Sequence, residues 1–283
     1  MSKYSLKHFE RYRVDSGSKV KLPKRPTTDA KNIPAREEAD AATDKAAEHI
    51  GQLQDVLYAE GKHALLVVLQ GMDAAGKDGT VRRVFDNVNP TGVNVTSFKQ
   101  PTWLELRHDF LWRCHEKVPA RGTLGVFNRS YYEDVLIVRV HADRLLPDNL
   151  IGDKKLWDRR FTLINSFERL LADNGTTVLK FFLHISKQEQ AQRFRDRQKD
   201  PDKHWKLAAA DFTERGFWND YQAAYEEMLP ETSTDHAPWY IIPGDKKWAR
   251  NYIISHIIAA TLERMNPKFP ELQDKSLITK RFK

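Results

Sequence analysis

One loop constrains the fold more than any other part of this sequence. An apolar run from Leu65 to Leu69 leads into the pattern Gly-x-x-x-x-Gly-Lys between Gly71 and Lys77, and a helical pattern follows. A buried strand that feeds such a loop into a helix N-terminus is the setting of a phosphate-binding loop, or P-loop. Backbone N–H groups and the helix dipole attract an anion there. The sequence therefore predicts a phosphate site directly after the first strand of an α/β fold.

The loop departs from the usual form because it contains two acids. Asp78 stands where a Ser or Thr would follow the lysine to hold magnesium, and Asp73 lies inside the loop. Two carboxylates would repel a bare phosphate, so they indicate a cation between them, and oxygen ligands of this kind suit Mg²⁺. Lys77 is the point charge that reaches a transferring phosphoryl group. We expect phosphate contacts from Met72, Ala74, Ala75, Gly76, Lys77, Asp78 and Gly79.

Composition excludes several classes of protein. The chain has 283 residues and a single cysteine, Cys114, so it can form neither an internal disulfide nor a metal cluster of the cysteine type. No apolar run approaches the roughly 20 residues that a membrane span needs. The first residues lack the apolar stretch of a secretory signal. We expect a cytoplasmic protein with no membrane partner.

Positive charge is concentrated at the N-terminal end. The formal net charge is +7, and residues 1–36 contain ten Lys or Arg against three Asp or Glu, while the two signs balance in the remainder. A basic arm of this kind can contact a polyanion or dock on an acidic neighbouring subunit. It can equally be a solvated, flexible leader, and the sequence leaves these alternatives open.

Strand-like apolar runs alternate with helical patterns, an order typical of a parallel sheet covered by helices on both faces. We expect strands at 64–70, 93–98, 123–128, 176–185 and 239–242. We expect helices at 35–60, 77–87, 102–112, 131–140, 158–173, 187–199, 211–228 and 246–264. The prediction is a P-loop kinase-like, three-layer α/β/α domain with a five-stranded parallel sheet. Its predicted bounds are 37–266, with the arm at 1–36 and a tail at 267–283.

A second group of polar residues follows the third predicted strand. Ligands of open α/β sheets bind beyond the carboxyl ends of the strands, and Asn128 and Arg129 lie at that point. Many P-loop proteins carry a magnesium-directing Asp there, whereas this chain has Asn128. Arg129 is suited to clamp a phosphate. Glu133 is either a metal ligand or an acid that stabilises the next helix N-terminus. We assign nucleotide binding to Asn128, Arg129, Tyr132 and Glu133.

A third, basic run occupies residues 193–206. Arg193 and Arg197 are four residues apart and share a helix face. A basic helical segment after the fourth strand is where a nucleotide kinase has its lid, which brings arginine to the transferring group and excludes water. We expect a helical lid at about 190–215 in which Arg193 or Arg197 closes over that group, with Lys203 and Lys206 on the phosphate chain. A solvated charged face is the other interpretation.

Together these three runs resemble the polyphosphate kinase 2 family, over about residues 45–265. The matching signatures are Gly71-Met-Asp-Ala-Ala-Gly-Lys-Asp-Gly79, Phe127-Asn-Arg-Ser-Tyr-Tyr-Glu-Asp-Val135 and the arginine-rich segment with Trp205-Lys206. The resemblance implies phosphoryl transfer between inorganic polyphosphate and a nucleotide, with Mg²⁺ or Mn²⁺, in a homo-oligomer such as a dimer or tetramer. The loop acid and lysine of the family fall on Asp73 and Lys77. Its Asp-Arg pair falls on Asn128 and Arg129.

The asparagine at position 128 is a departure from the family pattern. It resembles the subgroup that phosphorylates both nucleoside mono- and diphosphates, and it shifts the metal role toward Asp73, with Asp78 and Glu133 as further candidates. The predicted activity is transfer from polyphosphate to AMP, ADP, GMP or GDP, with a reversible reaction.

Two other functions compete with this prediction. The first is an ATP-dependent nucleotide or small-metabolite kinase, against which Asp78 argues. The second is a P-loop NTPase that binds nucleic acid through the basic arm. The chain lacks an Asn-Lys-x-Asp guanine motif and an aromatic–basic nucleic-acid signature, so we expect no nucleic-acid partner.

Overall fold

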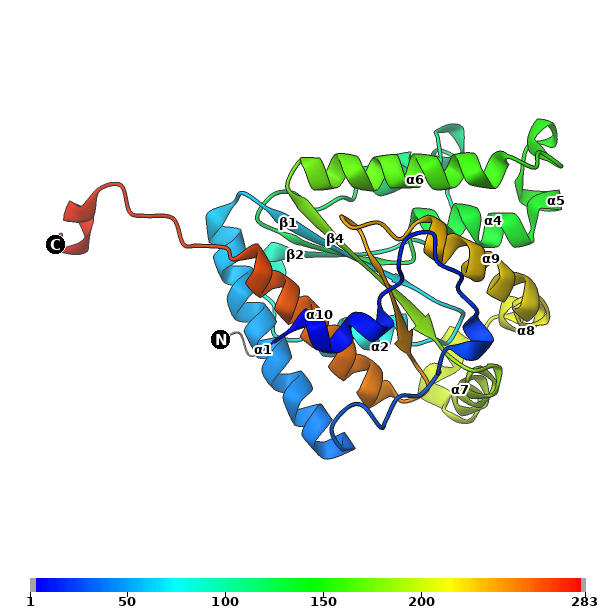
Figure 1. Cartoon of the computed structure of the whole chain (residues 1–283), viewed down its shortest axis with the longest axis horizontal. Helices are drawn as coiled ribbons and strands as arrows, with labels where there is room; N and C mark the ends of the chain where they lie inside the picture. Colours follow the sequence, from blue (N-terminus) through cyan, green and yellow to red (C-terminus); the bar gives the residue numbers. More distant parts are fainter. Residues whose placement is uncertain (1–3, 281–283) are drawn as a thin grey trace.

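A five-stranded sheet forms the centre of the molecule (Figure 1). The computed structural model describes residues 4–280. All neighbouring strands run parallel, in the order β2-β3-β1-β4-β5. The strands are β1 (Ala64–Gln70), β2 (Val93–Ser97), β3 (Leu124–Asn128), β4 (Thr176–His184) and β5 (Trp239–Pro243). Central strand β1 is buried along its whole length, as expected for a strand with helices on both faces.

Helices cover both faces of the sheet, which confirms the predicted three-layer α/β/α fold (Figure 1). One layer contains α1 (Arg36–Glu60), α2 (Lys77–Val84) and α10 (Lys247–Met265). The other contains α4 (Ile137–Val140), α6 (Leu156–Asp173) and α9 (Trp218–Glu231). The shorter helices are α3 (Trp112–His115), α5 (Ala142–Leu145), α7 (Lys187–Lys199) and α8 (Ala209–Gly216). Within residues 4–280, every helix is too short or too polar to cross a lipid bilayer.

Local signals in the sequence set several helix ends. Helix α1 stops at Gly61, whose φ of 64° is the left-handed conformation favoured by a glycine after a helix. Ser186 begins α7, because its side-chain oxygen accepts a hydrogen bond from the Glu189 backbone N–H at 3.0 Å. Along α6, Phe161, Ile164 and Phe167 are buried at a spacing of three, which directs one face of the helix to the core.

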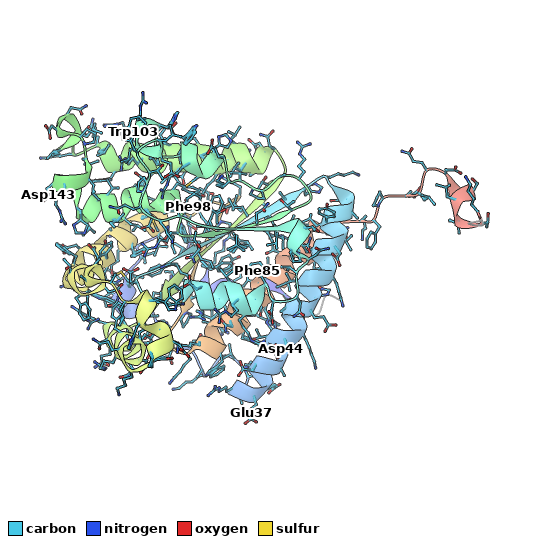
Figure 2. All side chains as sticks on the ribbon, turned by 180° about the vertical axis from the view of Figure 1, so that it is seen from behind. Glu37, Asp44, Phe85, Phe98, Trp103 and Asp143 are labelled. Atoms are coloured by element: carbon cyan, nitrogen blue, oxygen red, sulfur yellow. The ribbon has the colours of Figure 1, made fainter. Side chains whose placement is uncertain are left out.

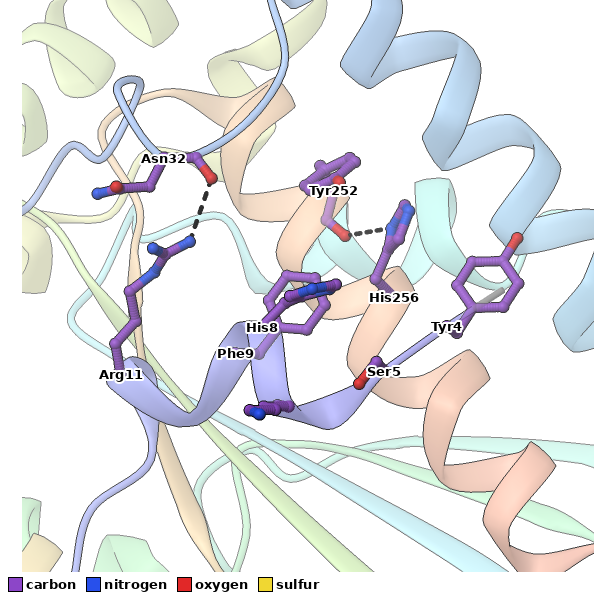
Figure 3. Close-up of a pocket in the computed structure, with 9 residues that line it drawn as sticks. Tyr4, Ser5, His8, Phe9, Arg11, Asn32, Tyr252 and His256 are labelled. Atoms are coloured by element: carbon purple, nitrogen blue, oxygen red, sulfur yellow. Dashed lines mark hydrogen bonds between the residues drawn. The ribbon is translucent and has the colours of Figure 1, made fainter. Parts of the chain in front are cut away.

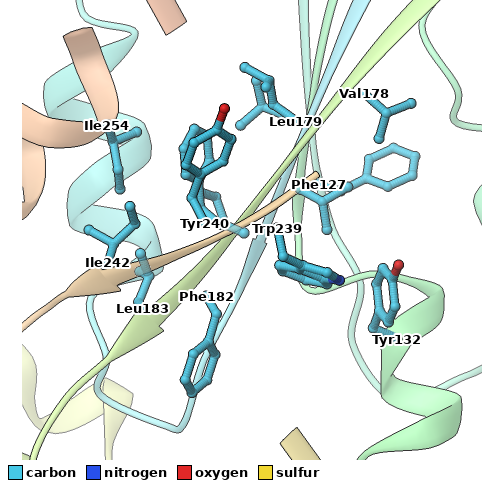
Figure 4. Close-up of a cluster of buried hydrophobic side chains, with 14 of the residues drawn as sticks. Phe127, Tyr132, Val178, Leu179, Phe182, Leu183, Trp239, Tyr240, Ile242 and Ile254 are labelled. Carbon is cyan, nitrogen blue, oxygen red and sulfur yellow. The ribbon is translucent and has the colours of Figure 1, made fainter. Parts of the chain in front are cut away.

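The core contains large aromatic side chains from the strands (Figure 4). Trp239 on β5 is fully buried, and its indole N–H donates to the Thr232 hydroxyl at 2.9 Å. Its ring packs edge-on against Tyr132, with centroids 4.8 Å apart. Phe182 on β4 and Ile254 on α10 belong to the same core. The sheet is therefore held in place by packed side chains from both helical layers.

One fully buried ion pair joins α6 to β4. Lys180 and Glu168 have no exposed side-chain surface, and Lys180 Nζ lies 2.6 Å from Glu168 Oε2. Both Tyr131 and Tyr132 donate their hydroxyl hydrogens to Glu168 Oε1 at 2.8 Å. Lys180 also donates to the Thr232 carbonyl at 2.5 Å. Since Tyr131 and Tyr132 follow β3 directly, this network fixes the chain that leaves the sheet at the site described below.

The predicted helix at 102–112 is wrong. The structure has a short 3₁₀ turn, Glu105–Arg107, and then α3. Trp103 (Figure 2) and Leu106 are 72% and 69% exposed, whereas Phe110 and Leu111 pack against the core, so the apolar side chains of this segment do not all share one buried face. An isolated helix of this length is marginal without such a face.

Two other predicted helices are split. The segment 131–140 is a 3₁₀ turn, Tyr131–Val135, followed by α4, because Leu136 has non-helical angles of −116° and −85°. The segment 211–228 is divided between α8 and α9 at Phe217, where ψ is 19°. Helix periodicity in the sequence continues through both breaks, so it does not reveal them.

The N-terminal segment is part of the core, which corrects its prediction as an appended arm. Phe9, Tyr12 and Leu22 are buried. The Val14 backbone N–H donates to the Trp239 carbonyl at 2.9 Å. Its apolar residues are spaced irregularly among basic ones, so neither a helical nor a strand period marks them in the sequence.

This segment also encloses a pocket of about 710 Å³ against α10 (Figure 3). Tyr252 and His256 of α10 form one wall, while Lys7 and Arg11 bring positive charge. The pocket shares no lining residue with the cleft at the sheet edge described next.

Candidate active site

The loop between β1 and α2 forms the floor of a cleft at the carboxyl ends of the strands. Gly76 has a φ of 103°, and a β-carbon there would lie 2.0 Å from Arg250 Nη1, so only glycine fits. Ala74 is also left-handed, with a φ of 62°. Lys77 folds back over the loop and donates to the Gly71 carbonyl at 2.7 Å. The loop is thereby closed around its own lysine.

Lys77 is buried, with 8% of its surface exposed. The pKa of its ammonium group is lowered to about 8, chiefly by burial and also by the charge of Arg129. Asp73, Glu133 and Asp78 act in the opposite direction. The lysine therefore has both cationic and acidic neighbours, and a bound anion would favour its protonated form.

Arg129 and two acids form an ionic cluster at the end of β3. Arg129 Nη2 lies 2.5 Å from Asp73 Oδ1, and Nη1 lies 3.3 Å from Glu133 Oε2. Both carboxylates, Glu133 foremost, raise the pKa of Arg129 above its already high ordinary value. Arg129 has a φ of 66°, a strained angle for a non-glycine residue. Such strain is concentrated at functional sites, because the surrounding structure must impose it.

Asp78 and Asn128 face each other across the cleft. The Asn128 amide donates to Asp78 Oδ1 at 2.7 Å, and Lys206 Nζ lies 3.5 Å from Asp78 Oδ2. Partial burial would raise the pKa of Asp78, but the Asn128 hydrogen bond and the Lys206 charge outweigh burial, and the pKa is lowered. Asp78 therefore remains ionised and oriented at the first turn of α2.

The two arginines of α7 have different environments. Arg193 is buried: Nη1 donates to the Ala74 and Ala75 carbonyls at 2.9 and 2.8 Å, and Nη2 donates to the Gly244 carbonyl at 2.6 Å. These hydrogen bonds fix the loop carbonyls to α7. Arg197 lines the cleft and makes no ion pair within residues 4–280; its guanidinium lies 5.3 Å from the Phe194 ring centre. Of the two, Arg193 is fixed by hydrogen bonds to the loop, whereas Arg197 is partly exposed.

The cleft has a volume of about 860 Å³ and collects most of the predicted site residues. Those that line it are Asp73, Ala74, Ala75, Gly76, Lys77, Asp78, Gly79, Asn128, Arg129, Arg193, Arg197, Lys203 and Lys206. Met72 and Glu133 line a smaller adjoining pocket, which also reaches Asp73 and Arg129.

One predicted site residue lies elsewhere. Tyr132 was expected to bind a nucleotide, but it is completely buried, and its hydroxyl donates to Glu168 in the core. Its neighbour Arg129 faces the cleft because the chain turns sharply between them, into the 3₁₀ turn that follows Ser130.

The cleft also contains residues that were not among the predicted site residues. Lys247 and Arg250 come from α10, and Trp205 comes from the turn after α7. Trp205 is 77% exposed, unusual for so large an aromatic side chain. An arginine within the mostly apolar run of α10 is the one sequence signal that could have indicated Arg250.

This arrangement can hold phosphate groups and neutralise them, and it offers carboxylates on which a cation can sit. Ten lining side chains are basic and four are acidic, so the cleft carries an excess of positive charge. With a parallel sheet, a glycine-lysine loop at a helix N-terminus and basic side chains opposite, the fold and site define a kinase-like phosphotransferase.

Comparison with known proteins identifies the family. The model of the polyphosphate kinase 2 family matches residues 34–270. An AMP/ADP-polyphosphate phosphotransferase of Meiothermus ruber is 54% identical over 220 residues, which cover 78% of this chain and 79% of that protein. An ADP-polyphosphate phosphotransferase of Rhodopseudomonas palustris is 46% identical over 266 residues, covering 93% and 92%. The crystal structure of polyphosphate kinase 2 from Arthrobacter aurescens TC1 has a TM-score of 0.89 at 36% identity, covering 98% of both chains. The chain belongs to the polyphosphate kinase 2 family, which confirms the resemblance found in its motifs.

Proposed function

We propose that this enzyme transfers a phosphoryl group between inorganic polyphosphate and nucleoside mono- and diphosphates. AMP and GMP would give ADP and GDP, and ADP and GDP would give the triphosphates. The observation that carries the proposal is the excess of basic side chains around the loop 71–77, because two polyanions must lie in one cleft. Family membership and the names of the two relatives support it.

The carboxylates of the cleft fit a hydrated divalent cation. Within residues 4–280, no three His, Cys, Asp or Glu side chains are grouped to hold a metal by themselves. Mg²⁺ in kinases is bound through one or two carboxylates together with substrate phosphates and water. Asp73 and Asp78 both line the cleft and match that requirement, and Glu133 is a further candidate beside Asp73. Bound Mg²⁺, or Mn²⁺, would neutralise charge on the phosphates.

The residues of the chain would then act by positioning and charge neutralisation. Transfer to a phosphate oxygen needs no general base, since the acceptor is already ionised near neutral pH. The loop N–H groups and Lys77 hold the phosphoryl group that passes between the substrates. Arg129 leaves its carboxylate partners and binds the phosphate of the nucleotide in a bidentate manner.

We also propose that α7, the following turn and α8 act as a lid. Arg197 closes over the transferring group, while Lys203 and Lys206 contact the polyphosphate chain. The Lys206–Asp78 contact at 3.5 Å already joins this segment to the loop. Arg193, whose guanidinium bonds to loop carbonyls, would maintain the cradle in open and closed forms.

A dimer or tetramer remains part of the proposal. Leu163 and Leu170, seven residues apart on α6, are each 51% exposed and offer apolar area to a second subunit. Light scattering after size-exclusion chromatography would measure the mass of the assembly.

Product analysis tests the proposed activity. The enzyme is incubated with Mg²⁺ and polyphosphate, and AMP, ADP, GMP and GDP are each offered as acceptor; a parallel series replaces polyphosphate with ATP. We expect polyphosphate-dependent products from wild type, none from Lys77→Met, and normal yields from Lys154→Met, an exposed lysine outside the cleft. Transfer from ATP alone would favour a conventional kinase. Salt-dependent binding to duplex DNA without transfer would favour a nucleic-acid-binding NTPase.

A further inference from the structure

Arg250 is a buried cation next to the phosphate-binding loop. It lies in the first turn of α10, which packs beside α2 (Figure 1), and only 2% of its surface is exposed. Its Nη1 donates to the Ala75 carbonyl at 3.1 Å. The 2.0 Å from Nη1 to an ideal β-carbon on Gly76 places the guanidinium directly against the N-terminus of α2.

No carboxylate neutralises Arg250 within residues 4–280. Its Nε and Nη2 donate to the Asn251 side-chain oxygen at 3.2 and 2.9 Å. With the Ala75 contact, three of its five N–H groups have acceptors. Burial lowers the pKa of the Arg250 guanidinium, and the charge of another cation, Arg193, adds to this effect.

Arg250 differs in this respect from Lys180, another deeply buried cation. Lys180 is equally deep in the protein, and Glu168 balances its charge at 2.6 Å. Burial of a cation without an anion destabilises a protein, because the charge loses its hydration and gains no partner. An uncompensated arginine against an anion-binding helix terminus therefore indicates that its partner is the anion itself.

We propose that Arg250 is a positioning residue of the phosphate cradle, whose charge is balanced only when a phosphate group occupies the loop 71–77. It fixes the Ala75 carbonyl, so that the loop N–H groups face the cleft, and it adds positive charge beneath the bound phosphate. This role rests on the proposed function, since it requires that the loop binds phosphate.

If Arg250 had a purely structural role, its replacement would have a different effect. The Ala75 carbonyl also accepts a hydrogen bond from Arg193, at 2.8 Å, so the loop retains one brace when Arg250 is replaced. If Arg250 served only as a brace, its replacement would change the stability of the free protein and leave anion affinity unchanged. If its charge is balanced by substrate, anion affinity must change.

Thermal unfolding with tripolyphosphate as the probe separates these roles. Arg250→Gln keeps hydrogen-bond donors without the charge, and Arg250→Lys keeps the charge. Arg264→Met alters an exposed arginine on the same helix and serves as the control. The melting temperature is measured against tripolyphosphate concentration, without metal or nucleotide, so that the stabilisation reports binding to the folded protein.

We expect tripolyphosphate to stabilise wild type and Arg264→Met with the same half-saturating concentration. Loss of one charge-assisted contact predicts that this concentration rises at least about tenfold in Arg250→Gln. It should rise less than about threefold in Arg250→Lys. Wild-type affinity in Arg250→Gln would overturn the role of Arg250 alone. If wild type and Lys77→Met responded identically, with no saturable stabilisation, the proposed function would fail too.

Discussion

Raising the pH above about 8 should weaken capture of polyphosphate, because the free enzyme loses the proton of Lys77. The pKa of Lys77 is lowered from 10.5 to about 8, because burial and the charge of Arg129 outweigh the opposing effect of Asp73, Glu133 and Asp78. At pH 9.5 only about 3% of the lysine would remain charged, so kcat/KM for polyphosphate falls about tenfold for each pH unit. Bound phosphate raises the pKa of the lysine, so kcat should hold its value to a higher pH than kcat/KM.

Initial rates of ADP formation test this prediction, with saturating AMP, limiting polyphosphate and constant ionic strength between pH 6.5 and 10. Lys77→Arg retains its charge throughout the range and should give a flat profile, at a lower level because the guanidinium is larger. Lys154→Met should reproduce the wild-type fall. A wild-type kcat/KM that is constant to pH 10, or the same fall in Lys77→Arg, would refute the reasoning.

Three further predictions address the support of the cleft and its cation. Lys180→Met leaves the buried Glu168 without a cationic partner and should lower the free energy of unfolding in urea by about 3–5 kcal/mol; a loss below about 1 kcal/mol would contradict this. Gly76→Ala forces a β-carbon against Arg250 and should reduce the transfer rate at least about 10²-fold in an enzyme with an unchanged far-ultraviolet circular dichroism spectrum; near-normal rates would contradict it. EDTA should abolish transfer, with recovery on Mg²⁺ or Mn²⁺. Asp73→Asn should raise the half-activating metal concentration at least about tenfold, and an unchanged value would exclude Asp73 as a ligand.

The fold could be predicted from sequence wherever local patterns and burial coincide. Strand β1 has its predicted bounds because an apolar run meets turn residues at both ends. The prediction failed at 102–112, where Leu104 and Leu106 belong to the apolar pattern that predicted a helix and yet remain exposed. It also failed for residues 4–22, whose burial depends on contacts with β5 and α10 that lie more than 200 residues away.

The site was predictable where its residues are adjacent in a motif. Lys77 and Arg129 line the cleft as expected, because each follows a strand whose carboxyl end lies at that sheet edge. Arg250 was missed because α10 approaches the loop only through the tertiary fold. Tyr132 was predicted to bind a nucleotide because it is close to Arg129 in the sequence. That proximity does not show that the chain turns into the core, where the Tyr132 hydroxyl donates to Glu168.

The two loop acids acquire a common explanation from their partners. In the structure Asp73 is paired with Arg129, and Asp78 is paired with Lys206 and Asn128. On the proposed function, Asp73 and Asp78 would hold a divalent cation, and Arg129 and Lys206 would then be available to the phosphates of the two substrates. Each acid thus pairs with a basic side chain in the structure and would hold metal when the polyanions bind. A Ser or Thr at position 78 could bind metal but could not form an ion pair with Lys206, because a neutral hydroxyl does not attract an ammonium group strongly.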